Sequence, residues 1–339
     1  MENEKPLLTI AIPTYNGART IRNMLDILIP QVDSRVEIII SDNCSTDETQ
    51  SIAQIYQIKY AFIKYVRNDM NIGADRNFLQ CMRMADGKFT MLVSDDDIII
   101  ENSLHRILSF LAKYPLTSLA YLHTISFKDH YIDAMHCTSF KTHSRDIEKD
   151  IVTKNKKEFF SYADRQWGFT SSFLWATERM QNIENADQYF DTYWLQSYVH
   201  ILCSNRSDDQ LGIISGPCIA AGEYGIMNNY DVTIIEAVHY KKMLDFAIIH
   251  AGYEKKQLYN EYIWKVCYLG SRTVVKQRTL GINKTNVLLL IQKTWRYPYA
   301  WIALFPFLLI PPRICKIMLR IYRKKQGRSD ATYVNRTTM

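Results

Sequence analysis

The sequence has neither a GxGxxG nor a GxxxxGKS motif, so it contains neither a dinucleotide fingerprint nor a P-loop. Its seven cysteines are scattered and form no CxxC pair. This pattern argues against a disulfide framework and against a zinc site, and it favours a reducing compartment. No repeat or low-complexity segment is present. Because both phosphate-binding loops are missing, the charge of a bound phosphate would have to be met by a metal ion and by cationic side chains.

Targeting and membrane-spanning signals are also missing. The first eight residues, MENEKPLL, contain neither a basic nor an apolar region, so we expect no signal peptide. Residues 299–312 form an uncharged run of 14 residues. A spanning helix needs about 20 residues and tolerates prolines poorly, so this run predicts no transmembrane span.

Positive charge is concentrated near the C-terminus. The net charge is +6, and residues 313–328 carry seven cations and no acid, which leaves −1 for the rest of the chain. The basic character is therefore a property of this segment and not of a broad nucleic-acid-binding face, so we expect no nucleic-acid partner. Aromatic residues precede the uncharged run and cations follow it, an order typical of an interfacial membrane anchor. Such an anchor would partly bury Trp301, Phe305, Phe307 and Leu308; the alternative is a buried helix with a solvated basic end.

The first 95 residues alternate between two hydrophobic periodicities. Apolar runs predict strands at residues 7–12, 36–40, 62–66 and 89–93, and helical spacing predicts helices at residues 18–28, 46–56 and 74–84. Pro13 should stop the first strand, and Thr46 is a candidate N-cap for the second helix. Strands that alternate with helices predict an α/β fold with a mostly parallel central sheet flanked by helices.

Polar residues follow three of the predicted strands. They are Thr14, Tyr15 and Asn16 after the first, Asp42 and Asn43 after the second, and Ser94, Asp95, Asp96 and Asp97 after the fourth. The carboxyl ends of parallel strands meet at one edge of an open sheet, where ligands bind. We therefore expect these clusters to form one site.

The three consecutive aspartates, Asp95, Asp96 and Asp97, indicate a metal-binding site. Adjacent carboxylates next to a core strand are costly unless a cation pairs with them. Mg²⁺ or Mn²⁺, shared with substrate phosphates, would meet this need, whereas a solvated acidic turn is the simpler alternative. Arg76, early in the third helix, is the natural cationic partner for phosphate.

Four motifs together resemble the family 2 inverting glycosyltransferases. They are IPTYNG at residues 12–17, EIIISDNCSTD at 37–47, NIGADRNFLQCMRMADGKF at 71–89 and SDDDI at 94–98. The SDN, NxGxxRNF and SDD variants look most like the abequosyltransferase-like branch of bacterial surface-polysaccharide enzymes. The resemblance covers about the first 110 residues and implies the GT-A fold, which binds nucleotide-sugars.

The resemblance also implies roles for individual residues. For the nucleotide, Pro13, Thr14 and Tyr15 would line the nucleoside pocket, and Asp42 would accept a hydrogen bond from the base. Asn71 and Arg76 would also contact the nucleotide. For the metal, Asp96 would be the principal ligand with Asp95 and Asp97 beside it, and Asp95 would approach the ribose or the metal. Asn43 and Ser94 stand where many relatives have acids. The ligand assignment could therefore shift by one position.

Inverting transfer also needs a base for the acceptor hydroxyl. Residues 189–205 offer Asp191 and His200, with Tyr193 and Trp194 able to stack on a sugar. His200 lies in an apolar, helix-like setting and could equally be a core histidine. Asp187 and Glu223 are further candidates for the base.

We expect a metal-dependent enzyme that transfers a sugar from a nucleotide-sugar to a glycan or lipid-linked acceptor, working in the cytoplasm at the inner face of the plasma membrane. The alternative is a non-catalytic nucleotide-sugar-binding or scaffold protein of the same fold. The expected parts are a GT-A domain at residues 1–225 (nucleotide-sugar half 1–115, acceptor half 116–225), a helical extension at 226–294, a membrane-associating segment at 295–328 and a tail at 329–339.

Overall fold

The computed structural model describes residues 5–127, 147–163, 166–222, 231, 233–279 and 285–325. The chain divides into two compact units, one made of Met1–Tyr224 with Asp245–Gln257 and the other of Gly225–Leu244 with Leu258–Met339. The expected end of the first domain, residue 225, lies one residue beyond the first of these segments. The return of residues 245–257 to the first unit was not expected.

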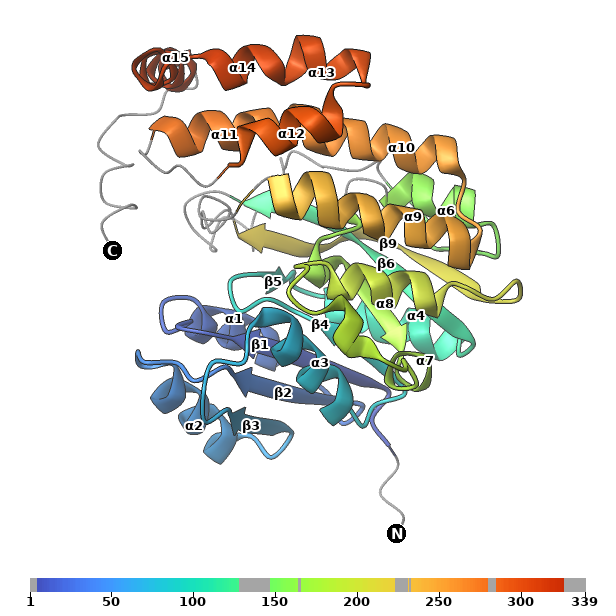
Figure 1. Ribbon diagram of the computed structural model, residues 1–339. Coiled ribbons are helices and arrows are strands. Elements are labelled where there is room, and N and C mark those ends of the chain that lie inside the picture. Colours follow the sequence, from blue (N-terminus) through green and yellow to red (C-terminus); the bar gives the residue numbers. More distant parts are fainter. Residues whose placement is uncertain are drawn as a thin grey trace. The chain divides into compact units, whose positions relative to one another are not determined.

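The strands described in the first unit form one nine-stranded sheet (Figure 1). Their bounds are β1 Leu8–Thr14, β2 Val36–Asp42, β3 Ile63–Arg67, β4 Phe89–Leu92, β5 Ile98–Ile99, β6 Thr117–Phe127, β7 Ile151–Thr153, β8 Phe173–Ala176 and β9 Gln210–Gly222. The order is β3-β2-β1-β4-β8-β6-β9-β5, and β7 pairs with β9. Pairing is parallel from β3 to β4 and between β6 and β9, whereas β8 runs antiparallel to both its neighbours.

Helices lie along this sheet as the alternating pattern predicted. They are α1 Ile21–Leu28, α2 Thr49–Lys59, α3 Ala74–Met84, α4 Ser103–Lys113, α6 Lys156–Ala163, α7 Thr177–Gln181 and α8 Leu195–Cys203, with 3-10 turns η1 Ile29–Gln31, η3 Thr170–Ser172 and η4 Ala186–Tyr189. Helices α9 (Tyr240–Ala251) and α10 (Lys255–Ile263) each contain residues of both units.

Alternation along the strands decides which helix covers which face. In β1, the side chains of Leu8, Ile10 and Ile12 join a hydrophobic cluster with apolar residues of α1, α2 and α4. Successive side chains of a strand point to opposite faces, so Thr9 and Ala11 face the other layer. Helix α3 packs against β1, β2 and β4, and α8 packs against β6 and β8. The sheet is therefore covered on both faces, as its apolar strands require.

Two local predictions were wrong. Strand β1 continues through Pro13 to Thr14, because β4 pairs with β1 only as far as Ala11 and leaves Pro13 with one strand neighbour, β2. Thr46 does not cap α2, which begins three residues later at Thr49. Instead, Thr46 donates its N–H to Asn16, and this contact belongs to the candidate site.

The second unit is helical. Besides parts of α9 and α10, it contains the π-helices η6 Thr233–His239 and η7 Trp264–Leu269 and the helices α11 Gly270–Thr279, α12 Val287–Thr294, α13 Pro298–Ala303, α14 Phe305–Leu309 and α15 Pro312–Lys325. Helix α11 packs against η7, α14 and α15. Among the described residues, every helix is too short or too polar to cross a membrane.

Candidate active site

Hydrogen bonds draw the loops after β1 and β2 together. Asn16 donates its N–H to Ser45 Oγ at 2.8 Å, and Asn16 Oδ1 accepts from the Thr46 N–H at 2.8 Å. Asp47 Oδ2 accepts from the Ala18 N–H at 3.0 Å. The prediction that polar clusters after neighbouring strands meet at one edge of the sheet is confirmed for these loops.

Asp95 brings the loop after β4 to the same edge. Thr14 Oγ1, at the end of β1, donates a hydrogen bond to Asp95 Oδ2. Gly17 lies directly against this pair, and a Cβ at Gly17 would overlap both bonded oxygens. The glycine of the IPTYNG motif is therefore required for close approach, since any side chain would force Thr14 and Asp95 apart.

The three consecutive carboxylates turn to different partners. Asp96 Oδ1 accepts from Ser94 Oγ at 2.6 Å, and Asp97 Oδ2 accepts from Ser171 Oγ at 2.6 Å. Ser171 Oγ in turn accepts from the Ser94 N–H at 3.0 Å. Asp97 is only 2% exposed. A buried carboxylate turned to Ser171 is poorly placed for a shared metal, so the structure does not support Asp97 as a ligand.

Within the described part of the chain, the remaining two carboxylates form no ion pair. Burial raises the pKa of Asp95 to about 7, opposed by the Thr14 hydrogen bond and reinforced by the negative charge of Asp96. Burial also raises the pKa of Asp96. Because Mg²⁺ is commonly held by one or two carboxylates together with substrate phosphates, this donor pair fits a cation shared with a diphosphate. In the part of the chain that the structure describes, no three His, Cys, Asp or Glu side chains could hold a metal by themselves.

Asp42 is committed to the protein rather than free for a nucleotide base. Its Oδ1 accepts from the Ser45 N–H at 2.8 Å, and its Oδ2 accepts from Tyr65 Oη at 2.8 Å. Arg67 Nε lies 3.8 Å from Oδ2, and Asp42 has no exposed surface. The prediction that Asp42 accepts a hydrogen bond from the nucleotide base is therefore corrected, because these partners make Asp42 a support for the loop after β2.

Asn43 and Asn71 shape the entry to α3. Asn43 Nδ2 donates to Asn71 Oδ1 at 2.9 Å, and Asn43 Oδ1 accepts from the Ile72 N–H at 2.9 Å. Asn71 Oδ1 also accepts from the Gly73 N–H at 2.9 Å, and Gly73 has a φ of 86°, which favours glycine. The asparagine that replaces a family acid thus holds the segment before α3, and Asn71 remains exposed beside it.

Arg76 and Asp191 form an ion pair across 115 residues of chain. Arg76 Nη1 lies 3.0 Å from Asp191 Oδ1, and Arg76 Cζ lies 4.6 Å from the centre of the Phe190 ring. The side chains are 42% and 76% exposed. Exposed ion pairs are weak, so both groups remain available to a ligand. The structure thus unites the predicted phosphate contact with one of the predicted bases.

His200 lies in an aromatic core and not in the site. Its side chain has no exposed surface, and its Nδ1 accepts a hydrogen bond from Trp175 Nε1 at 2.9 Å. The rings of Trp167 and Phe173 also pack against it. Burial lowers the pKa of His200. The prediction of His200 as a base is therefore corrected, because a buried imidazole cannot reach an acceptor hydroxyl.

Of the aromatic residues predicted to contact a ligand, the two tyrosines are exposed and the tryptophan is buried. Tyr15 is 50% exposed and Tyr193 is 59% exposed, whereas Trp194 is 4% exposed. Pro13 and Thr14 are also buried. Stacking on a ligand ring is therefore open to Tyr15 and Tyr193. Asp187 is exposed as well, and Glu223 lies outside the described residues.

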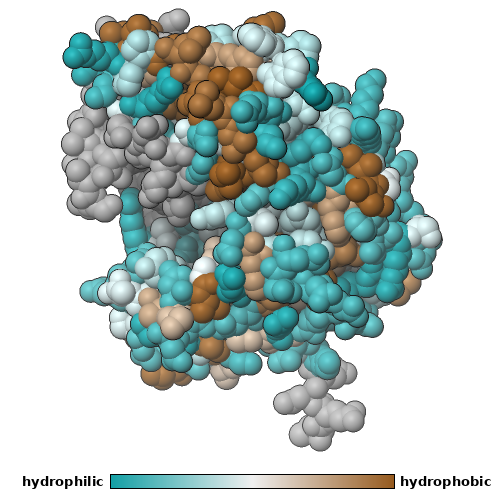
Figure 2. Space-filling view, in the orientation of Figure 1, coloured by the Kyte–Doolittle hydropathy of each residue, from teal (hydrophilic) through white to brown (hydrophobic). Residues whose placement is uncertain are grey.

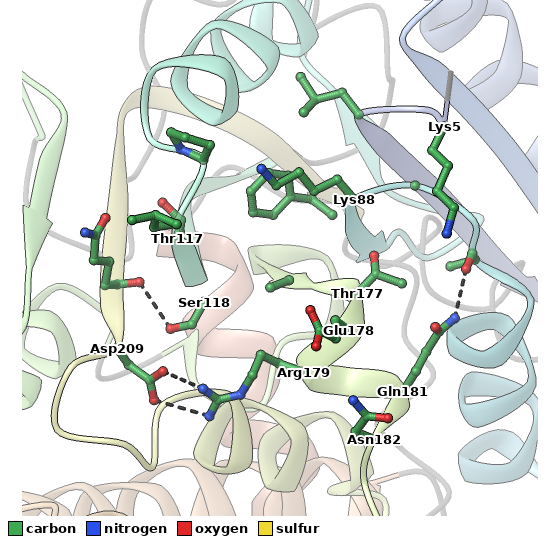
Figure 3. A pocket seen from close by; sticks show the side chains of 18 of the residues that line it. Lys5, Lys88, Thr117, Ser118, Thr177, Glu178, Arg179, Gln181, Asn182 and Asp209 are labelled. Carbon is green, nitrogen blue, oxygen red and sulfur yellow. Dashed lines mark hydrogen bonds and ion pairs between the residues drawn. The ribbon is translucent and has the colours of Figure 1, made fainter. Parts of the chain in front are cut away.

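A cavity of about 1250 Å³ lies at the opposite edge of the sheet, where β1, β4, β6 and β9 begin (Figure 3). Lys5, Lys88, Thr117 and Ser118 are among its lining residues, and Arg179 forms an ion pair with Asp209 there at 2.6 Å. None of the predicted site residues lines it. The converging loops, and not the larger volume, therefore mark the candidate site.

The family model described as Glycosyl transferase family 2 matches residues 9–190, and the chain belongs to this family. The abequosyltransferase RfbV of Salmonella typhimurium is 27% identical over 223 residues, covering 63% of this chain and 66% of that protein. TuaG of Bacillus subtilis, provisionally assigned to teichuronic acid biosynthesis, is 31% identical over 111 residues, which are 33% of this chain and 44% of TuaG. The chain thus spans less than two thirds of these relatives.

Solved structures confirm the predicted fold class. S. aureus TarS 1–349 in complex with UDP-GlcNAc has a TM-score of 0.57 and 15% identity, covering 95% of this chain and 93% of that one. The mannosyltransferase PcManGT from Pyrobaculum calidifontis, in complex with GDP-Man and Mn²⁺, has a TM-score of 0.51 and 14% identity, covering 92% and 87%. The fold is of the GT-A type with added C-terminal helices.

Sequence reasoning missed three residues that organise the site. Asp47 accepts hydrogen bonds from the loop after β1, Ser171 holds the acidic loop, and Asp75 bonds to the loop that follows Asp191. The SDNCSTD motif contained Asp47 and could have drawn attention to it. No local signal pointed to Ser171, which lies 74 residues from its partner Asp97.

The raised pKa of Asp95 predicts that Asp95→Asn stabilises the ligand-free protein at about pH 8. The folded parent favours the protonated Asp95 carboxyl, so the contribution of this carboxyl to stability is present at low pH and is lost as pH rises through about 7, where the variant loses nothing. Asparagine keeps an acceptor for Thr14 without the charge, and the expected gain is on the order of 2 kcal/mol. Thermal unfolding in EDTA measures it, with a smaller difference expected near pH 4. A variant less stable than the parent at the higher pH would contradict this.

His200→Leu should destabilise the protein without changing its pH–rate profile. The substitution leaves the buried Trp175 Nε1–H without an acceptor, which costs about 1–3 kcal/mol. Chemical denaturation measures the loss, and Ser51→Ala, an exposed change in α2, serves as a control. If the variant instead loses one arm of the pH–rate profile while its stability is unchanged, His200 would again be a candidate for the base.

Proposed function

We propose that this protein transfers a sugar from a nucleotide-sugar to a glycan or lipid-linked oligosaccharide, with inversion, during synthesis of a bacterial cell-surface polysaccharide. The observation that carries the proposal is the exposed ion pair of Arg76 with Asp191, in a chain that belongs to glycosyl transferase family 2 and has Asp95 and Asp96 in the loop after β4. RfbV is named for abequose transfer and TuaG for teichuronic acid biosynthesis, which supports this class of reaction.

The donor would lie at the carboxyl edge of the sheet, with its diphosphate between Arg76 and the acidic loop. Arg76 is exposed, and its guanidinium can donate parallel hydrogen bonds to phosphate oxygens. Asp95 and Asp96 would hold Mg²⁺ or Mn²⁺, which supplies positive charge to the leaving diphosphate. The Mn²⁺ and UDP-GlcNAc complexes of the fold neighbours support a cation and a nucleotide-sugar as ligands.

Asp191 is the group best placed to act as base. Its carboxylate is 76% exposed beside Arg76, whereas His200 is buried. In the proposed step Asp191 takes the proton of the acceptor hydroxyl, and that oxygen forms a bond to the anomeric carbon. The bond from this carbon to the diphosphate breaks, and the diphosphate leaves with the electron pair. An exposed base beside a phosphate-binding cation argues against a non-catalytic scaffold.

The second unit offers a surface suited to anionic lipid. In α15, Ile314, Ile317 and Ile321 recur at helical spacing and are 47%, 55% and 54% exposed. The exposed cations Arg313, Lys316 and Arg320 precede them by one residue each. Such an apolar stripe beside a cationic stripe is typical of a helix that lies in a membrane interface. We therefore propose peripheral binding to the inner face of the plasma membrane, where a lipid-linked acceptor would be found.

The exposed apolar residues before α15 agree only in part with the predicted Trp301, Phe305, Phe307 and Leu308. Trp301, Ile302 and Leu309 are 60%, 76% and 80% exposed, whereas Phe305 and Leu308 are 8% and 4% exposed and pack inside the unit. Figure 2 shows hydrophobic side chains gathered over the C-terminal helices. Phe305 and Leu308 are therefore not available to lipid. Arg328 and the tail at 329–339 lie outside the described residues.

Asp191→Asn should lower kcat by about 10²–10⁴ and leave donor affinity unchanged, because the base acts on the acceptor. Transfer is measured with a panel of nucleotide-sugars, and donor binding by calorimetry. Asp187→Asn is the matched comparison, since Asp187 is an exposed carboxylate four residues upstream. Loss of turnover in Asp187→Asn alone would move the base to that residue.

Replacing Ile314, Ile317 and Ile321 together with serine should reduce binding to phosphatidylglycerol vesicles by at least about tenfold, since each buried isoleucine contributes about 1.5–3 kcal/mol. Donor binding should be unchanged. The control replaces Ile55, Ile58 and Ile249, which are exposed in the first unit, with serine. Equal vesicle binding by both triple variants would refute the proposed lipid surface.

A further inference from the structure

The loop that carries Asp191 has an unusual backbone. Asp191 has a φ of 61° and Tyr193 a φ of 62°, so two non-glycine residues in three adopt the left-handed region. Each such residue costs free energy and persists only where the surrounding structure determines it. Tyr193 is an aromatic residue, for which this conformation is especially unfavourable. Something must therefore hold this loop in place.

Asp75, in the first turn of α3, holds this loop in place through hydrogen bonds. Its Oδ2 accepts hydrogen bonds from the N–H groups of Thr192 at 3.0 Å and Tyr193 at 3.2 Å. Asp75 is only 5% exposed, and burial raises the pKa of its carboxyl. A buried carboxylate is costly, and bonds to backbone N–H groups near the start of α8 offset part of that cost.

Two further contacts set the same loop. Thr192 Oγ1 donates to the Tyr189 carbonyl oxygen at 2.6 Å and accepts from the Trp194 N–H at 3.1 Å. The Trp194 ring fills the space beside Gly168, where a Cβ would overlap it. These contacts fix both ends of the loop, and the Asp75 bonds fix its centre.

Adjacent residues of α3 thus hold Asp191 from two sides. Arg76 contacts the Asp191 side chain, while Asp75 binds the backbone of the two residues that follow it. We propose that Asp75 is a positioning residue, which fixes the loop so that the carboxylate of Asp191 stands beside the donor diphosphate. This inference rests on the proposed role of Asp191 as base. Asp75 itself need not touch either substrate.

We therefore expect the Asp75 bonds to affect kcat and not donor affinity. Proximity and orientation of a base affect the reacting state, and a misplacement of about 1 Å can cost about 10² in rate. The backbone of Arg76 is held within α3, Asp95 bonds to Thr14 and Asp96 bonds to Ser94, all outside the 191–194 loop. Loss of the Asp75 bonds should therefore lower kcat and leave donor affinity unchanged.

The test compares Asp75→Ala and Asp75→Asn with the parent protein. Asp75→Ala should lower kcat about 100-fold with donor affinity unchanged, while Asp75→Asn, whose amide oxygen can still accept, should recover most of that loss. Asp150→Ala is the matched control, because Asp150, an exposed residue just before β7, accepts from the N–H and hydroxyl of Ser215 in β9. Its kcat should equal that of the parent, and thermal unfolding compares the folds.

A double-mutant cycle separates positioning from a general structural role. If Asp75 acts through Asp191, then Asp75→Ala should cost little more once Asp191→Asn is present. A full additional loss in that background, an unchanged kcat in Asp75→Ala, or a loss of donor affinity in either Asp75 variant would overturn the inference. If Asp75→Ala does not fold, the kcat and donor affinity of Asp75→Asn, alone and with Asp191→Asn, decide between these outcomes. An unchanged kcat in Asp191→Asn would instead overturn the base assignment itself.

Discussion

The contact between Thr14 and Asp95 is the constraint around which the site is arranged. It joins the end of β1 to the acidic loop after β4, and it requires a glycine at position 17 because no Cβ fits beside it. The neighbouring loop after β2 is tied to the same edge by Asn16 and Asp47. The parallel strands β1, β2 and β4 bring these loops together, and side-chain hydrogen bonds then set their distances.

This arrangement gathers the carboxylates of Asp95 and Asp96 in a loop where, among the described residues, neither forms an ion pair. Burial raises the pKa values of Asp95 and Asp96, so ionising both carboxylates costs free energy in the ligand-free protein. The cost of the unpaired charges is thus consistent with a site organised for a ligand and not for ligand-free stability.

Helix α3 carries contacts on both the proposed donor side and the proposed acceptor side. Asn71 and Gly73 shape its entry, Arg76 faces the proposed diphosphate, and Asp75 reaches the loop of Asp191. One rigid helix therefore carries contacts to both proposed substrates. Positioning by a helix is more accurate than positioning by a loop, so contacts from α3 could hold a strained segment such as 191–194 in place for the proposed base.

The sequence by itself determined the α/β fold, the strand-end clusters and the family, because hydrophobic periodicity and short motifs are local signals. Only the tertiary structure decided the fate of individual polar residues. His200 and Asp191 were both candidates for the base in the sequence, but His200 is enclosed by Trp167, Phe173 and Trp175, whereas Asp191 is exposed beside Arg76. Asp42 and Asp97 likewise proved to be buried supports. Burial and hydrogen-bond partners depend on residues distant along the chain, so no local pattern could reveal them.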